Sequence, residues 1–161
     1  MQTLVFSLPE NEIISETIIA GISGKKGDFT LRNFPDGETY VRVMTDVAGK
    51  DVCIVCTLNQ PDNKILPLLF LCYALRDLKV KSICLVAPYL AYMRQDKQFN
   101  PGEAITSEYF AKLLSTSVDR LITVDPHLHR RVSMNEIYSI PCKVLHAAKL
   151  ISTWIKKNIP D

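Results

Sequence analysis

The sequence lacks a strong excess of either charge. Its 19 basic and 17 acidic residues give a formal net charge of +2. Proteins that bind nucleic acid usually carry a concentrated basic face. We therefore expect no nucleic-acid partner, and any anion that binds here must be held by a local group of side chains.

Long apolar runs and a basic leader are also missing. The longest candidate membrane span, residues 65–75, falls far short of the roughly 20 apolar residues that a membrane helix needs. The first ten residues lack the basic n-region of a signal peptide. The sequence therefore predicts a protein without membrane association.

Glycine and proline are sparse, at 6 and 9 residues of 161, whereas 47% of the residues are hydrophobic and 22% are charged. This composition excludes collagen-like and coiled-coil proteins and global disorder. A chain of this length suits one domain with its own core, so we predict a single domain over residues 1–161.

The five cysteines are an odd number, and most lie in apolar runs where a thiol behaves as a small hydrophobe. Cys53 and Cys56 have the spacing of a redox or zinc motif. They lie in a predicted strand, however, whose pleat points their side chains to opposite faces. We expect free thiols in a reducing cytoplasm.

Hydrophobic periodicity predicts strands over residues 3–6, 29–33, 39–44, 52–56, 83–87, 120–124 and 142–145. It predicts one helix after residue 10, which packs through Ile13, Ile14 and Ile18 and stops at Gly21 and Gly24. Further helices are expected over residues 64–79, 106–115 and 147–157. The strands at 83–87 and 120–124 are continuously apolar, which indicates an α/β fold with a parallel sheet covered on both faces.

Two of the predicted helices carry specific expectations. We expect the helix near residues 61–79 to be buried on most sides and its regular part to begin near Lys64, because Pro67 is tolerated only in a first turn or at a kink. The helix at 106–115 is expected to pack through one face, formed by Tyr109, Phe110, Leu113 and Leu114.

Two loops after the apolar strands carry the candidate chemistry. Residues 88–103 form a long connection with Arg94, Gln95, Asp96 and Lys97, donors and charges suited to phosphate oxygens and a base edge. The alternative is a solvated charged loop.

The second loop, residues 125–129, follows the next strand. Asp125 and His127 lie at i and i+2, where they could hold a divalent metal or a phosphate-bridging water. The alternative is an Asp125 that caps the turn beside surface histidines. Because parallel strands end at one edge, we expect Arg94, Asp125 and His127 to lie close together.

Three motifs together resemble one family. Phe34-Pro-Asp-Gly-Glu38, Pro88-Tyr-Leu-Ala-Tyr-Met-Arg-Gln-Asp96 and Leu121-Ile-Thr-Val-Asp-Pro-His127 are similar, in order and spacing, to the N-terminal half of ribose-phosphate pyrophosphokinases. The resemblance implies a phosphoribosyltransferase-like α/β domain, one of two similar halves, with a mainly parallel sheet and a small antiparallel β-flap. It also implies homo-oligomers in which the 34–38 flap reaches a neighbouring subunit.

The resemblance further implies ATP and ribose 5-phosphate as substrates and Mg²⁺ as the metal. Arg94 and His127 match catalytic positions, and Asp125 and His127 match metal and triphosphate positions. The positions that match nucleotide-binding residues are Phe34, Asp36, Gly37, Glu38, Arg94 and Gln95.

Two departures from the family pattern matter. The segment after His127 differs, and His129, Arg130 and Arg131 match no family role. The acidic pair and Thr-Gly-Thr-like turn of the ribose-5-phosphate loop, which belong to the second half, do not occur in the 161 residues, so we expect the second catalytic domain to be absent and the chain alone to be inactive. The altered segment leaves open a non-catalytic regulatory paralogue. A metal-dependent hydrolase built on His127 and His129 lacks further ligands.

Overall fold

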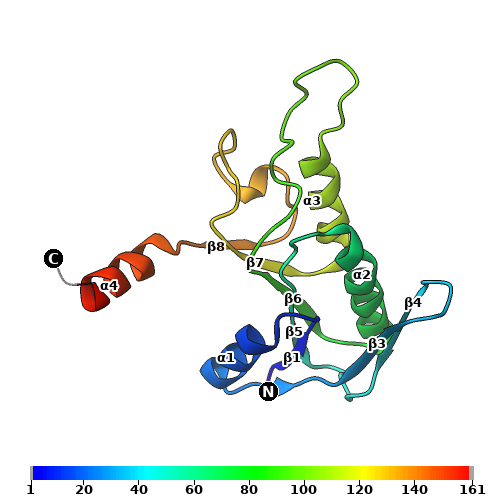
Figure 1. Ribbon diagram of the computed structural model, residues 1–161. Helices are drawn as coiled ribbons and strands as arrows, with labels where there is room; N and C mark the ends of the chain where they lie inside the picture. The colour runs from blue at the N-terminus through cyan, green and yellow to red at the C-terminus, as the bar shows by residue number, and fades with distance from the viewer. Residues whose placement is uncertain (1, 160–161) are drawn as a thin grey trace.

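The computed structural model describes residues 2–159. Its core is a six-stranded sheet in which every neighbouring pair is parallel. The strand order is β2-β1-β5-β6-β7-β8, and the bounds are β1 Leu4–Ser7, β2 Lys25–Lys26, β5 Asp51–Val55, β6 Ser82–Ala87, β7 Arg120–Val124 and β8 Cys142–Leu145. The α/β class with a mainly parallel sheet is confirmed (Figure 1).

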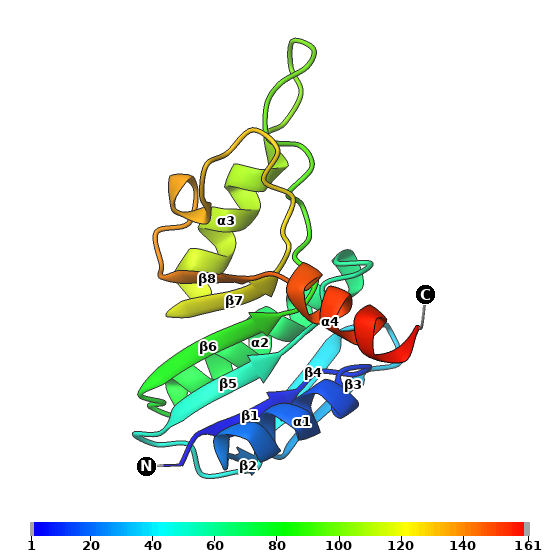
Figure 2. The same cartoon turned by 90° about the vertical axis from the view of Figure 1, so that its left-hand side faces the viewer.

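Helices lie on both faces of this sheet. Figure 2 shows α1 (Glu12–Ile22) in front of the edge of the sheet at β1, with α2 (Asp62–Asp77) and α3 (Thr106–Ser117) behind the sheet. The main core lies between the sheet and the latter two helices, where Leu71, Leu85 and Leu114 are almost completely buried. Opposite directions of strand crossover place helices on opposite faces.

The predicted flap is a two-stranded antiparallel hairpin, β3 (Phe29–Asn33) and β4 (Thr39–Val43). The phenyl ring of Phe29 packs edge-on against Phe6 in the core, with 5.8 Å between ring centroids. The hairpin base is thereby anchored, while its tip projects beyond the sheet (Figure 1).

The expectation for the first helix was partly wrong. Ile13 and Ile14 are exposed, and α1 instead turns Ser15, Ile18 and Ile19 toward the sheet. The spacing of the isoleucines in this helix allows either of two neighbouring faces to pack inward. The position of β1 determines that the face with Ile18 and Ile19 is the one that packs. The helix also runs through Gly21 and ends at Ile22.

The other two helices also differ from expectation. Regular helix begins at Asp62, two residues earlier than predicted, and includes Pro67. Leu66, Phe70 and Tyr73 of α2 are exposed, so that helix is not buried on most sides. In α3, Tyr109 points to solvent, whereas Phe110 and Leu114 face the core as predicted. A short strand, β2, and a 3₁₀ turn over Met134–Glu136 were not predicted.

The last helix, α4 (Ala148–Asn158), stands apart from the sheet, and none of its residues is buried. No helix within residues 2–159 has the length and apolar character to cross a bilayer.

Candidate functional site

The candidate site lies where β6 and β7 end. These strands are parallel neighbours, with Ala87 opposite Thr123, so the loops that follow them leave the sheet at the same edge. Ligands of open parallel sheets bind in the crevice beyond the carboxyl ends of the strands. The fold therefore places both candidate loops where a ligand is expected.

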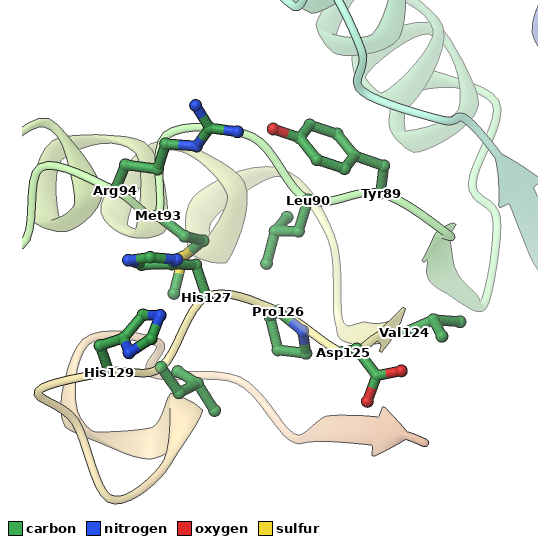
Figure 3. A pocket seen from close by; sticks show the side chains of 10 residues that line it. Tyr89, Leu90, Met93, Arg94, Val124, Asp125, Pro126, His127 and His129 are labelled. Atoms are coloured by element: carbon green, nitrogen blue, oxygen red, sulfur yellow. The ribbon is translucent and has the colours of Figure 1, made fainter. Parts of the chain in front are cut away.

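The two loops enclose a cleft of about 490 Å³. Arg94 comes from the loop after β6, and His127 and His129 come from the loop after β7; all three line the cleft (Figure 3). No acidic side chain within residues 2–159 forms an ion pair with the exposed Arg94 guanidinium. The cleft thus presents an unneutralised cation beside two imidazoles, a composition suited to an anion.

The two histidines contact each other. Their ring centroids lie 4.2 Å apart with the ring planes inclined by 60°. His129 matches no family role and entered the sequence analysis only in the hydrolase alternative, yet it lies in the cleft with His127. The i, i+2 spacing of the two histidines on an extended segment is a signal that could have indicated their shared face, although the sequence analysis applied it to Asp125 and His127.

Asp125 has a different orientation. Its backbone adopts a left-handed conformation (φ 40°), and its carboxylate points away from the two imidazoles (Figure 3). Oδ1 lies 2.8 Å from Nδ1 of His146, and Oδ2 accepts a hydrogen bond of 3.0 Å from the amide of Ala147. These two bonds hold the pKa of Asp125 below its usual value, the amide of Ala147 contributing most.

A second hollow of about 380 Å³ adjoins the cleft and shares Tyr89 and Arg94 with it. Gln95 and Thr106 line this second hollow, and the Thr106 hydroxyl lies 3.4 Å from Oε1 of Gln95. Arg94 and Gln95, predicted to bind the same ligand, therefore face one continuous depression.

The flap tip lies outside both hollows. Phe34 is exposed, and its ring contacts Tyr40 edge-on while the Arg32 guanidinium lies 4.8 Å from its centroid. Gly37 adopts φ 94°, a conformation that the tight turn requires and that glycine tolerates. Asp36 and Glu38 are exposed beside it. Within one subunit, the structure does not bring the flap residues to Arg94.

A partly buried network joins the two loops. Arg130 Nη1 donates to Oδ1 of Asp96 at 2.8 Å, and the Asp96 side chain is only 2% exposed. Arg131 donates to the Asp96 carbonyl and to Glu108 of α3, at 3.2 and 3.1 Å. No sequence pattern predicted this network, because polar contacts from one loop to another loop and to a helix leave no periodic signal in the sequence.

The described residues provide few suitable ligands for a divalent cation. No cluster of three or more His, Cys, Asp or Glu side chains within residues 2–159 is arranged to hold a metal ion. Mg²⁺ prefers oxygen ligands, and both carboxylate oxygens of Asp125 are engaged with His146 and Ala147. A cage of protein ligands for Mg²⁺ is therefore not formed by this arrangement.

A doubly wound sheet with a cationic cleft at its carboxyl edge places this chain among α/β domains of the phosphoribosyltransferase-like type that its motifs resemble. Residues 3–117 match the family described as the N-terminal domain of ribose phosphate pyrophosphokinase, and the chain belongs to that family.

Similar proteins carry the same name. A ribose-phosphate pyrophosphokinase of Saccharolobus solfataricus is 38% identical over 130 residues, covering 80% of this chain and 44% of the relative. One from Halobacterium salinarum is 30% identical over 158 residues, covering 98% of this chain and 55% of the relative. The chain thus spans about half the length of the curated relatives it matches.

The fold has a close counterpart among solved structures. The phosphoribosylpyrophosphate synthetase from Mycobacterium smegmatis superposes with a TM-score of 0.88 at 24% identity, over 98% of this chain and 53% of that chain. The predicted family resemblance and fold are confirmed; the roles of the individual site residues stay predictions.

Proposed function

We propose that this chain is the ATP-binding and subunit-contact half of a ribose-phosphate diphosphokinase. The observation that carries the proposal is the shared cleft, in which Arg94 from one loop and His127 from the other face the same space. Triphosphate oxygens would occupy this cleft, and Gln95 would contact the nucleotide in the adjoining hollow.

The proposed reaction transfers a diphosphate group. The anomeric hydroxyl of ribose 5-phosphate attacks the β-phosphorus of ATP, a new O–P bond forms and the hydroxyl proton passes to solvent. The bond from the β-phosphorus to the oxygen that bridges it to the α-phosphate breaks, and AMP leaves with that oxygen. Catalysis of such a transfer depends on positioning and on neutralising charge. Arg94 supplies a fixed positive charge, and His127 supplies an imidazole donor.

Asp125 and His127 remain the proposed residues on the metal side. Because the carboxylate of Asp125 is bound to His146 and Ala147, it would have to release both partners to reach a cation. We therefore treat Mg²⁺ as the counter-ion that arrives with ATP, and no step of the proposal passes through a protein-held metal.

The flap is proposed to act between subunits. Phe34, Asp36, Gly37 and Glu38 are exposed and lie outside the cleft of their own subunit. An exposed aromatic ring on a hairpin is suited to a neighbouring subunit, where Phe34 would stack on the adenine and the polar residues would contact its edge. The homo-oligomer is proposed to form through this flap.

Titration with a non-hydrolysable ATP analogue tests the nucleotide site. Arg94→Ala and His127→Ala are expected to weaken calorimetric binding by about tenfold or more, since tenfold corresponds to about 1.4 kcal/mol. Arg42→Ala removes an exposed arginine of β4 that lies outside the cleft; it is the matched control and should bind as the parent does. Equal affinity in all four proteins would contradict the proposal.

The second candidate is a non-catalytic regulatory paralogue that associates with active synthetases. The observation in its favour is the segment after His127, where Arg130 and Arg131 serve to fasten the loops. This candidate predicts no binding of the ATP analogue together with a change in turnover when the chain is mixed with an active relative. Nucleotide binding lost in Arg94→Ala favours the first candidate.

A further inference from the structure

Tyr92 has an unusual backbone conformation. Its φ of 57° lies in the left-handed region, where a bulky side chain is rare and the backbone is strained. The residues on both sides, Ala91 and Met93, are buried in the core, and Arg94 follows at the cleft. The left-handed residue thus lies at the turn by which the chain passes from the core to the exposed Arg94. Strain of this kind persists only where surrounding contacts hold it.

Two side-chain contacts hold this turn. The Tyr92 hydroxyl donates a hydrogen bond to Oδ1 of Asp62, and the Tyr92 ring packs on Phe110 of α3 with 4.9 Å between the ring centroids. Asp62 is the first residue of α2, where the helix dipole favours a carboxylate. The hydrogen bond to Asp62 raises the pKa of Tyr92, so the hydroxyl remains a donor. The turn is therefore fastened to both α2 and α3.

The backbone of this segment gives little support of its own. Within the described part of the chain, no backbone hydrogen bond involves residues 90–94. The nearest ones lie at the carbonyls of Tyr89 and Gln95, which accept hydrogen bonds of 3.0 and 3.2 Å from other segments. Among the described residues, the bond from Tyr92 to Asp62 is the only side-chain hydrogen bond made by residues 90–94. This bond is therefore the polar contact that can fix the turn before Arg94.

We propose that Tyr92 and Asp62 are positioning residues, whose hydrogen bond holds the left-handed turn and so keeps the Arg94 guanidinium at the cleft. The bearing of this turn on nucleotide binding rests on the proposed function, in which Arg94 binds triphosphate oxygens. Without the bond, the turn relaxes toward the ordinary conformations of a non-glycine residue, and Arg94 faces the cleft in only a fraction of the molecules. A ligand that needs Arg94 in place then binds more weakly in inverse proportion to that fraction.

Binding of a non-hydrolysable ATP analogue, measured by calorimetry, tests this consequence. Tyr92→Phe keeps the ring but removes the hydroxyl, and Asp62→Ala removes the acceptor; each should weaken binding by about threefold or more. Neither loss should exceed that of Arg94→Ala, because both act through Arg94. In the Arg94→Ala background, Tyr92→Phe should have no further effect. A general structural role would instead weaken binding by the same factor in either background, and that result overturns the proposal.

Two exposed residues of α2 provide matched controls. Tyr73→Phe removes a tyrosine hydroxyl from the middle of the helix, and Asp77→Ala removes a carboxylate from its end. Neither side chain lines the cleft or the adjoining hollow. Both variants should therefore bind the analogue as the parent does, and circular dichroism should show that every variant is folded at the temperature of the titration.

Backbone relaxation measured by nuclear magnetic resonance tests the turn without any nucleotide. In the parent, the amide order parameters of Met93 and Arg94 should be about 0.85, as in rigid backbone, and in Tyr92→Phe they should fall toward about 0.6. Tyr73→Phe should leave them at the parental values. Unchanged order parameters in Tyr92→Phe overturn the proposal.

Failure of this proposal is distinguishable from failure of the proposed function. If Arg94→Ala weakens binding of the analogue but Tyr92→Phe binds as the parent does, the nucleotide site stands and the positioning role is overturned. If Arg94→Ala itself binds as the parent does, the proposed nucleotide site fails, and the order parameters in Tyr92→Phe still decide whether Tyr92 and Asp62 hold the turn.

Discussion

Asp96 and Arg130 join the two loops of the cleft through a hydrogen-bonded ion pair of 2.8 Å, in which the carboxylate is almost fully buried and the guanidinium is half-exposed. The other carboxylate oxygen, Oδ2, is buried without a partner within the described residues. Removing the arginine would leave a buried charge without its counter-ion. The pair therefore holds the Arg94 loop against the His127 loop. Loss of either partner alone is expected to lower the free energy of unfolding.

We expect Arg130→Ala to lower the free energy of unfolding by about 1–3 kcal/mol, because it strands the Asp96 carboxylate. Urea denaturation followed by circular dichroism measures this. Arg42→Ala, an exposed arginine on β4, should change stability by less than about 0.5 kcal/mol. In the double variant with Asp96→Ala the losses should not add, since the residues contact each other. Strict additivity would mean that the pair contributes nothing.

Most strands of the sheet were predictable because continuous apolar runs follow from local pattern, whereas the strand order within the sheet was not predicted. The strands at 83–87 and 120–124 were expected as found, apart from one residue at the start of the first, and parallel pairing then places Arg94 and His127 at one edge. The Asp96–Arg130 pair and the orientation of Asp125 were not predictable. Each depends on a partner more than twenty residues away in a loop without periodicity.

Packing of the helices was only partly predictable for a related reason. Apolar positions on α1 allow two faces, and only the position of the sheet shows that Ile18 and Ile19, not Ile13, are covered. Likewise the apolar residues of α4 predict a helix but not that it stands clear of the sheet. Local pattern shows which residues are apolar, whereas tertiary contact decides which are buried.

Gly27 lies where a side chain has no room. A Cβ at this position would come within 2.4 Å of the Phe6 ring, whose core packing leaves it little freedom. We expect Gly27→Ala to reduce the free energy of unfolding by about 2–3 kcal/mol. Gly21→Ala is the matched control: it lies in α1, its Cβ would meet nothing within 4 Å, and it should stabilise by about 0.5–1 kcal/mol. Equal effects of the two substitutions would contradict this assignment.

The flap residue Phe34 is expected to contribute to self-association. Phe34→Ala removes an exposed ring, so the monomer should keep its stability within about 0.5 kcal/mol, while light scattering should show weaker association. Tyr109→Ala, which removes an even more exposed ring from α3, is the control and should associate as the parent does. If Phe34→Ala and the parent associate equally, the flap is not an interface.

The missing ribose-5-phosphate loop leads to an expectation about activity. Given ribose 5-phosphate and Mg-ATP, the 161-residue chain should form no phosphoribosyl pyrophosphate, because the loop expected of the family is absent from its sequence. Coupled detection of AMP and product against a heat-treated control measures this. Turnover above that control would show that other residues of the chain build an acceptor site.

The buried thiols make stability sensitive to alkaline pH. Burial raises the pKa of Cys53, Cys56 and Cys72 to about 12, whereas an unfolded thiol ionises near pH 8.5. Below about pH 8.5 the thiols are protonated in both states and their contribution is fully present. As pH rises from about 9 toward 12, only the unfolded chain releases these protons, so the folded state loses stability.

For each thiol, the free energy of unfolding is expected to fall by an amount approaching about 1.4 kcal/mol per pH unit. Lysines and tyrosines also titrate in this range, so the informative quantity is a difference between variants. Urea denaturation at pH 8 and pH 10 should show a shallower decline for Cys72→Ala than for the parent. Leu71→Ala, at the adjacent and equally buried position of α2, creates a cavity without removing a titrating group and should keep the parental slope. Identical slopes for the two variants would show that the Cys72 thiol does not titrate between the folded and unfolded states.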